Sequence, residues 1–162
     1  MIITRLEPVT KYKTKVYLDD QFAFCLSNRD IFMHGIKEEG FLSEADYKEL
    51  DADASKKAIV KAMNVLKQMD RTEHELRTKL KQDGFADKHI EDAISYVESF
   101  HYIDDVRYTV GYIQARKSSK SKMQIKMGLM KKGIDDDIIR QAYDEISEYY
   151  QEDQEDAEIE AI

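Results

Sequence analysis

A segment of fifteen residues recurs later in the chain, and this repeat limits which folds the sequence can adopt. Residues 71–85 realign with residues 120–134, which lie 49 positions further on. The apolar pairs that match are Leu76 with Ile125, Leu80 with Leu129, Phe85 with Ile134, Ile90 with Ile139 and Ala93 with Ala142. A repeat of this length is typical of small modules that bury their apolar faces by stacking on their neighbours.

The aligned segments also carry helix start and stop signals. Each copy opens with a hydroxyl residue followed three positions later by Glu or Gln, the capping box that satisfies free N–H groups at a helix start. These pairs are Thr72 with Glu75 and Ser121 with Gln124. Gly84 and Gly133 then supply the left-handed residue that ends a helix. We predict helices at 54–69, 72–83 and 87–100 in one module, and at 104–117, 121–132 and 135–150 in the next.

The first thirty residues have a different pattern. Residues 15–18 and 22–26 are β-branched and aromatic runs separated by Asp19-Asp20-Gln21, which predicts a β-hairpin. A lone hairpin is marginally stable, and residues 2–6, ended by Pro8, are the available third strand. A short helix around residues 31–36 closed by Gly40, and another opening at residue 43 and running to Leu50, are expected next.

Composition supports a mostly α fold, because 162 residues contain only six Gly and one Pro. We predict tandem three-helix modules in an elongated array with an N-terminal β-hairpin element. The expected divisions are a hairpin element (1–27), a short helical partial module (28–52), two three-helix modules (53–100 and 101–150) and an acidic tail (151–162). Acidic and small residues dominate the tail, so its end is expected to be frayed or disordered.

Several functional classes are disfavoured by the residues present. The chain opens without a signal peptide and has no apolar run long enough for a membrane span, so a cytoplasmic protein without membrane contact is expected. The single Cys25 excludes an internal disulfide. His34, His74, His89 and His101 have no metal-ligand spacing, and no phosphate loop or catalytic triad pattern occurs. We therefore expect a binding protein with no catalytic residues, metal or cofactor.

Charge is strongly segregated, although the net charge of −8 at first argues against a nucleic-acid partner. The stretch from Val106 to Ile134 has no acidic residue and eight basic ones: Arg107, Arg116, Lys117, Lys120, Lys122, Lys126, Lys131 and Lys132. Residues 135–162 carry twelve acids and only Arg140. With Tyr108 and Tyr112 interleaved, the basic segment suits phosphates or an acidic protein groove; the alternative is an ordinary solvated face.

Other groupings have structural interpretations. Met123, Met127 and Met130 form a stripe that we assign to the core, the alternative being an exposed binding patch. Gly128 in the same helix suggests a close helix approach. Asp104-Asp105 and residues 135–137 precede helical runs, so they are expected to be N-caps and not catalytic carboxylates.

The ordered set of motifs resembles the RecX family of bacterial recombinase regulators, in its hairpin-bearing form. The resemblance rests on Ile2-Ile3-Thr4-Arg5-Leu6-Glu7, the hairpin of residues 16–24, Arg71-Thr72-Glu73 through Leu80, Tyr102-Ile103-Asp104-Asp105 with Arg107-Tyr108, and Lys132-Gly133-Ile134. It covers residues 1 to 145. His101 stands where the family usually has Gly, Tyr108-Thr109 replaces Phe-Ala, Ser121-Lys122 replaces Gly-Pro, and Gly128 replaces an acidic residue.

The resemblance implies a non-enzymatic regulatory protein of DNA repair, homologous recombination and the SOS response. Such proteins bind the RecA recombinase filament on single-stranded DNA and inhibit its activity by capping or destabilising the filament. The expected contacts are the eight cations of residues 107–132, with weaker candidates Arg71, Arg77 and Lys81, and the protein is expected to be a monomer. The alternative is a direct nucleic-acid-binding protein built from three-helix units. A further hypothesis is that the acidic tail folds back on the basic segment.

Overall fold

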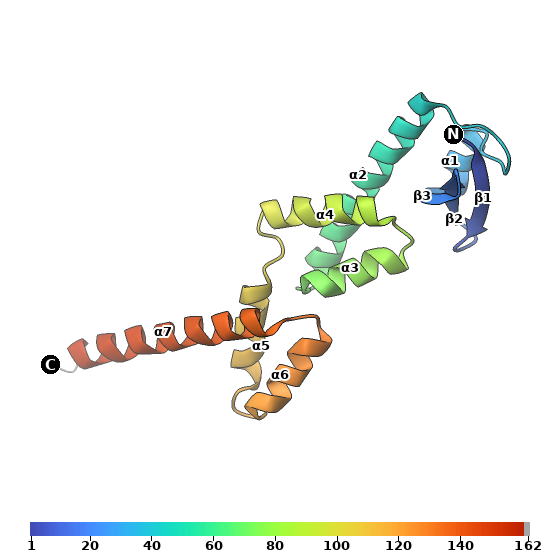
Figure 1. Cartoon of the computed structure of the whole chain (residues 1–162). Coiled ribbons are helices and arrows are strands. Elements are labelled where there is room, and N and C mark those ends of the chain that lie inside the picture. Colours follow the sequence, from blue (N-terminus) through green and yellow to red (C-terminus); the bar gives the residue numbers. More distant parts are fainter. Residues whose placement is uncertain (161–162) are drawn as a thin grey trace. The chain divides into compact units, whose positions relative to one another are not determined.

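A computed structural model describes the backbone of residues 1–160 and the side chains of residues 1–148 (Figure 1). This part of the chain contains a three-stranded antiparallel sheet and seven helices. It divides into two compact units: residues 1–68 with 76–102, and residues 69–75 with 103–162. None of the described helices is both long and apolar enough to cross a lipid bilayer.

The sheet of the first unit is formed by β1 (Ile3–Pro8), β2 (Lys13–Leu18) and β3 (Gln21–Ser27), in that spatial order. The predicted hairpin and the third strand are therefore confirmed, with Gln21 in the strand and not in the turn. Asp19 and Asp20 alone form the connection, with φ of 48° and 67°. Two left-handed residues give the turn the twist of the strands it joins, and Asp tolerates that conformation.

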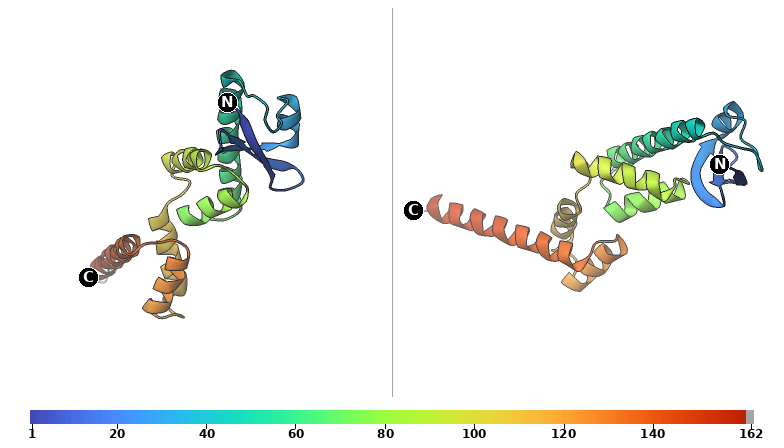
Figure 2. Two further views of the ribbon diagram at one scale, coloured as in Figure 1. Left: turned by 45° about the vertical axis from the view of Figure 1, so that its right-hand side comes forward. Right: turned by 45° about the horizontal axis from the view of Figure 1, so that its top comes forward.

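One face of the sheet packs on α2 (Glu44–Gln68), and β3 runs beside this helix (Figure 2). The core between them contains Val16, Phe24 and Leu26 from the strands with Leu50 and Ala54 from α2. The short helix α1 (Asn28–Met33) follows β3 directly, with Ser27 as its N-cap. It ends before the predicted residues 34–36 because Gly35 takes a left-handed φ of 59°.

Helix α2 is a single helix of 25 residues, so the two separate helices predicted at 43–50 and 54–69 are wrong. Residues 51–53 are Asp-Ala-Asp and contain no glycine or proline, so nothing in them breaks a helix. The buried residues continue across that segment at helical spacing: Leu50, Ala54, Ala58, Ala62 and Val65. The first half of the stripe faces the sheet core, and the second half belongs to the first three-helix module.

That module is completed by α3 (Glu73–Gln82) and α4 (Asp87–Ser99). Leu76 and Leu80 of α3 are fully buried, as are Ala93 and Val97 of α4. His89 is also fully buried, and its Nε2 lies 2.8 Å from Oδ1 of Asp51 on α2. The contact with Asp51 accounts for one ring nitrogen of this buried histidine.

The second module has the same order of helices: α5 (Asp105–Arg116), α6 (Lys122–Lys131) and α7 (Asp136–Glu160). Its core contains Ile113, Ile125, Leu129, Ile139 and Ala142. The last four are the repeat partners of buried residues in α3 and α4, so these positions are buried in both modules. Both capping boxes form, because Glu75 N–H and Gln124 N–H donate to the hydroxyls of Thr72 and Ser121. The predicted repeat is confirmed in detail.

Helix α7 is longer than predicted. The sequence predicts an end near residue 150, but the backbone is helical to Glu160. The predicted fraying of the tail also concerns residues 161–162, which lie outside the described residues. Glu, Gln and Ala are good helix formers, and residues 151–160 contain no Gly or Pro. Up to Glu160 the continuous helix leads away from α6 (Figure 1), which differs from the hypothesis that the tail folds back on the basic segment.

Two glycines end the repeated helices in the left-handed conformation, Gly84 with φ 95° and Gly133 with φ 79°. A Cβ on Gly133 would overlap the side chain of His74, whereas one on Gly35, also left-handed, would meet nothing within 4 Å. The two positions therefore separate the cost of backbone strain from the cost of a steric clash.

We expect Gly35→Ala to lower the free energy of unfolding by roughly 1 kcal/mol, from the left-handed backbone alone. Gly133→Ala is expected to cost about 2–4 kcal/mol, because overpacking against His74 adds to the same strain. Urea unfolding followed by circular dichroism measures both. Equal costs for the two variants would contradict the packing of residues 69–75 on the second module.

Candidate basic interface of the second module

The acid-free segment of residues 106–134 forms α5, the turn after it and α6. α5 and α6 pack on each other and on α7. Gly128 of α6 lies directly against the Tyr112 ring of α5, and a Cβ there would overlap the phenol. The predicted close helix approach at Gly128 is therefore confirmed. Because Ile125 and Leu129 also face the core, the lysines of α6 are directed to its other sides.

The predicted cations differ in exposure, and two of the partly buried ones form ion pairs. Lys126 forms an ion pair with Asp136 at 3.2 Å, and Lys132 one with Glu75 at 3.5 Å. Burial lowers the pKa of Lys132, but the Glu75 carboxylate and the Tyr108 hydroxyl outweigh it and raise the pKa above its usual value. The exposed members are Arg107, Lys117, Lys120, Lys122 and Lys131.

Arg116 lies over an aromatic ring. Its guanidinium carbon is 3.6 Å from the centroid of Tyr112, and Tyr112 in turn stacks on Tyr108 at 6.4 Å between centroids. These residues follow one another at i, i+4 and i+8, so they form one row along α5. Lys122 on α6 similarly lies 4.8 Å from the Tyr143 ring of α7.

A small hollow of about 240 Å³ opens beside this row. It is lined by Asp70, Arg107, Tyr108, Gly111, Tyr112 and Arg116. Gly111 has no side chain to fill the space, and a Cβ there would meet nothing within 4 Å. Sequence reasoning missed Gly111 and Asp70; the signal for the row was the i, i+4 spacing of the aromatic residues before Arg116.

The three weaker candidates for partner contacts, Arg71, Arg77 and Lys81, do not all belong to the same compact unit. Arg77 and Lys81 belong to the first unit, where Arg77 is bound to Glu91 through two contacts and Lys81 is exposed. Arg71 belongs to the second unit and is half-buried. Within the described part of the chain, its Nε is buried and has no hydrogen-bond partner.

The assignment of Met123, Met127 and Met130 to the core is wrong. Their exposed fractions are 64%, 56% and 56%. A ten-residue helix has one buried side, and Ile125 and Leu129 occupy it with Gly128. The methionines lie at i, i+4 and i+7 on the other side, so the alternative interpretation of this stripe, an exposed patch, describes the structure.

The acidic pairs near the helix starts act as caps. Asp104 accepts the N–H of Arg107 at 3.0 Å, and Asp135 accepts that of Ile138 at 2.9 Å. His101 has a φ of 58°, which is the conformation that a glycine would adopt without strain. Among the described residues, no group of three or more His, Cys, Asp or Glu side chains is arranged to hold a metal ion.

The start of α3 is fixed to this module by polar contacts. The Thr72 hydroxyl donates to the carbonyl of Lys132 at 2.6 Å, and the N–H of Glu73 donates to Asp105 at 2.9 Å. Burial raises the pKa of Asp105; the Glu73 N–H opposes this, and nearby carboxylates add to it, so the net pKa is above its usual value. The ionised form of Asp105 is therefore disfavoured in the folded protein.

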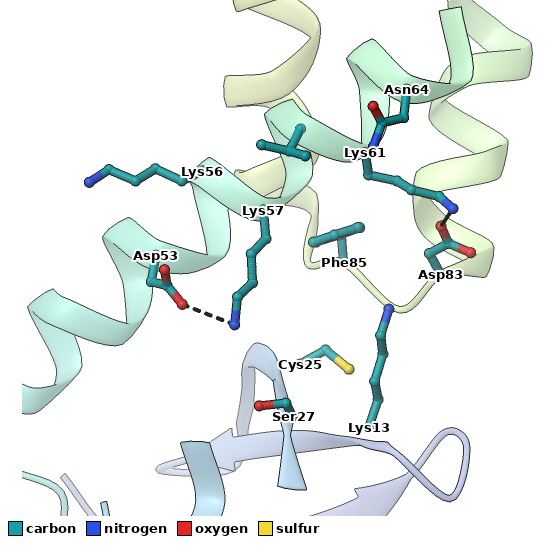
Figure 3. A pocket seen from close by; sticks show the side chains of 11 residues that line it. Lys13, Cys25, Ser27, Asp53, Lys56, Lys57, Lys61, Asn64, Asp83 and Phe85 are labelled. Atoms are coloured by element: carbon teal, nitrogen blue, oxygen red, sulfur yellow. Dashed lines mark ion pairs between the residues drawn. The ribbon is translucent and has the colours of Figure 1, made fainter. Parts of the chain in front are cut away.

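A separate, half-open hollow of about 570 Å³ lies in the first unit between the sheet and α2 (Figure 3). Two of its four lysines form ion pairs with the two acids of its lining: Lys57 contacts Asp53 at 3.0 Å, and Lys61 contacts Asp83 at 3.3 Å. Cys25 faces this hollow, and burial raises the pKa of its thiol, which disfavours the reactive thiolate. These neutralised pairs make the hollow a weaker anion site than the basic segment.

Comparisons with known proteins agree with the two-module arrangement. The family model for the first three-helix domain of RecX matches residues 58–96, and that for the second matches residues 104–142. The regulatory protein RecX of Caldanaerobacter subterraneus subsp. tengcongensis is 30% identical over 151 residues, which cover 90% of this chain and 76% of that protein. The chain belongs to the RecX family.

Other RecX relatives extend the likeness. The regulatory protein RecX of Clostridium acetobutylicum is 35% identical over 141 residues, or 85% of this chain, which spans 65% of that protein's length. A crystal structure of regulatory protein RecX has the same fold, with a TM-score of 0.57, 23% identity and coverage of 90% of this chain and 73% of that one. The crystal structure of RecX from Lactobacillus salivarius has a TM-score of 0.54 and 31% identity. This match covers 56% of this chain and 60% of that one.

Replacing Asp105 with Asn tests the cost of its burial, since an amide oxygen can still accept the Glu73 N–H. A raised folded pKa means that the stability which Asp105 contributes is present below its unfolded pKa, 3.8, and is lost as the pH rises through the folded value. The stability of Asp105→Asn relative to the parent should therefore increase as the pH rises from about 3.5 through the raised folded pKa of Asp105, and then level off. Urea unfolding at several pH values measures this; a difference that falls with pH would contradict it.

Proposed function

We propose that this protein binds RecA filaments on single-stranded DNA through the basic surface of its second module and inhibits the recombinase. Membership of a family of regulatory proteins supports the regulatory role. The choice of this surface rests on the α5–α6 segment, which contains no acidic residue between Val106 and Ile134. Its exposed cations are Arg107, Lys117, Lys120, Lys122 and Lys131. The protein acts by binding, without a catalytic group or cofactor, as a cytoplasmic monomer.

The charge distribution suits a nucleoprotein partner. Clustered exposed cations accelerate the encounter with a polyanion and with acidic protein surfaces, even when the net charge of the chain is negative. Arg116 and Lys132 hold their places through Tyr112 and Glu75, so they support the surface more than they offer free charge. Tandem modules of like fold also suit a partner that itself repeats along a filament.

The test is RecA ATPase activity on single-stranded DNA, with the protein added at two salt concentrations. A triple variant, Arg107→Gln with Lys120→Gln and Lys131→Gln, should need roughly tenfold more protein for half-inhibition at low salt, and the difference should narrow as salt screens the contacts. The matched control changes three exposed lysines of the first unit, Lys56, Lys67 and Lys79, to Gln. Equal inhibition by the two triple variants would contradict the proposed surface.

A second candidate function, direct binding of single-stranded nucleic acid, is favoured by the hollow beside Tyr108 and Tyr112. Stacked rings next to arginines are how sequence-independent single-strand binders hold bases and phosphates. Gly111 lines this hollow without a side chain, on the same helix as Arg107 and Arg116. The two functions differ in whether RecA is required for tight binding.

Gly111→Ala distinguishes them, because its methyl group narrows the hollow without touching another residue. Replacing a helical glycine with alanine should raise the free energy of unfolding by up to about 1 kcal/mol, so lost binding cannot be attributed to unfolding. Direct binding predicts a loss of roughly three- to tenfold in affinity for an oligodeoxythymidine by fluorescence anisotropy. If the oligonucleotide affinity is unchanged and RecA inhibition is intact, direct binding of single-stranded nucleic acid is contradicted and the regulatory function is favoured.

A further inference from the structure

Helix α6 exposes an apolar face that its own module does not use. Met123, Met127 and Met130 are each more than half exposed, while Ile125 and Leu129 on the opposite side are 2% and 0% exposed. The close contact of Gly128 with Tyr112 fixes how α6 is rotated on α5. The three methionines are therefore held outward by the packing of the rest of the helix.

The spacing of these residues matches a helix-pairing seam. Met123, Met127 and Met130 are separated by four and then three positions, the alternation that brings apolar residues to one side of a helix facing another helix. Methionine is flexible and polarisable, and proteins use it on surfaces that accommodate a partner's side chains. From the first to the last, the stripe spans about 10 Å, or two helical turns.

Lysines border this seam on both sides. Lys126 directly precedes Met127, and Lys131 directly follows Met130, which are the flanking positions where paired helices form interhelical ion pairs. Lys131 is exposed, and Lys126 shares its charge with Asp136 at 3.2 Å. A partner with carboxylates beside its own apolar seam would match this charge pattern.

We propose that α6 docks against an acidic amphipathic helix of a partner protein, with the three methionines as the apolar contact and Lys126 and Lys131 as the ionic borders. Naming that partner as a component of the RecA filament rests on the proposed function; the helix-binding property itself does not. The apolar seam explains a specificity for protein that cations alone do not give, because lysines serve a phosphate backbone and an acidic protein equally well.

Other occupants fit less well. Phosphates would use the lysines and leave three thioether side chains without contacts. Two copies of α6 would bring Lys126 and Lys131 of one copy beside the same residues of the other, and like charges at these positions are unfavourable. An acidic amphipathic helix would provide apolar contacts for the three methionines and carboxylates for the two lysines.

The test compares Met123→Gln with Met127→Gln and Met130→Gln against a control triple that changes the other internal methionines, Met33, Met63 and Met69. Gln keeps the length and the helix propensity of Met and removes its apolar character. The control residues are 66%, 37% and 58% exposed, so the two triples alter comparable surface positions. Unfolding followed by circular dichroism checks that both variants are folded.

Two probes are used: RecA filaments on single-stranded DNA, and a synthetic helical peptide with leucines on one face bordered by glutamates. The α6 triple should bind each at least about tenfold more weakly than the parent and the control, and this loss should persist at high salt because apolar contacts are not screened. Naked oligodeoxythymidine binding should not change. In the parent, ¹³C-methyl signals of the three α6 methionines should shift on adding the peptide, while those of the control methionines stay fixed.

Each alternative outcome is distinct. If the peptide binds the parent and the α6 triple equally, or shifts none of the three methyl signals, the docking helix is refuted whatever happens with RecA. If the peptide result holds but the parent does not bind filaments, the proposed function fails and the docking helix stands. An equal loss on naked oligonucleotide would assign the face to nucleic acid, and methyl shifts with protein concentration alone would assign it to a second copy; both overturn the proposal.

Discussion

A helix of ten residues can bury only one side, and much of the surface chemistry of this protein follows from that limit. In α3 the buried side holds Leu76 and Leu80; in α6 it holds Ile125 and Leu129. Most other residues of these short helices are partly or fully exposed. The cations and methionines of α6 are therefore exposed because two apolar residues, four positions apart, already satisfy its packing.

Much of the fold could be predicted because the signals are local or repeated. The capping boxes at Thr72 and Ser121 and the left-handed glycines at 84 and 133 act within a few residues of the features they determine. The continuity of α2 was missed because Asp51-Ala52-Asp53 has low apolar content, and its helicity depends on Leu50 and Ala54 packing on a sheet far away in sequence. Tertiary packing of this kind is not visible in a local pattern.

The candidate site was predictable in composition but not in geometry. The absence of acids between residues 106 and 134 identified the basic segment, yet the partners that hold Lys126 and Lys132 come from residues 136 and 75. Which cations are held and which are exposed therefore depended on the packing of three helices. The methionine stripe was misassigned because periodicity shows that residues share a helix face and does not show whether another element covers it.

The contact between Gly128 and Tyr112 links two positions that lie sixteen residues apart on different helices. A larger residue at 128 can be accommodated only if the ring at 112 becomes smaller or moves away from Arg116. Among homologous sequences, the identities at these two positions should therefore vary together. Where 128 carries a side chain, the neighbouring helix should lack the tyrosine and, with it, the platform on which the arginine rests.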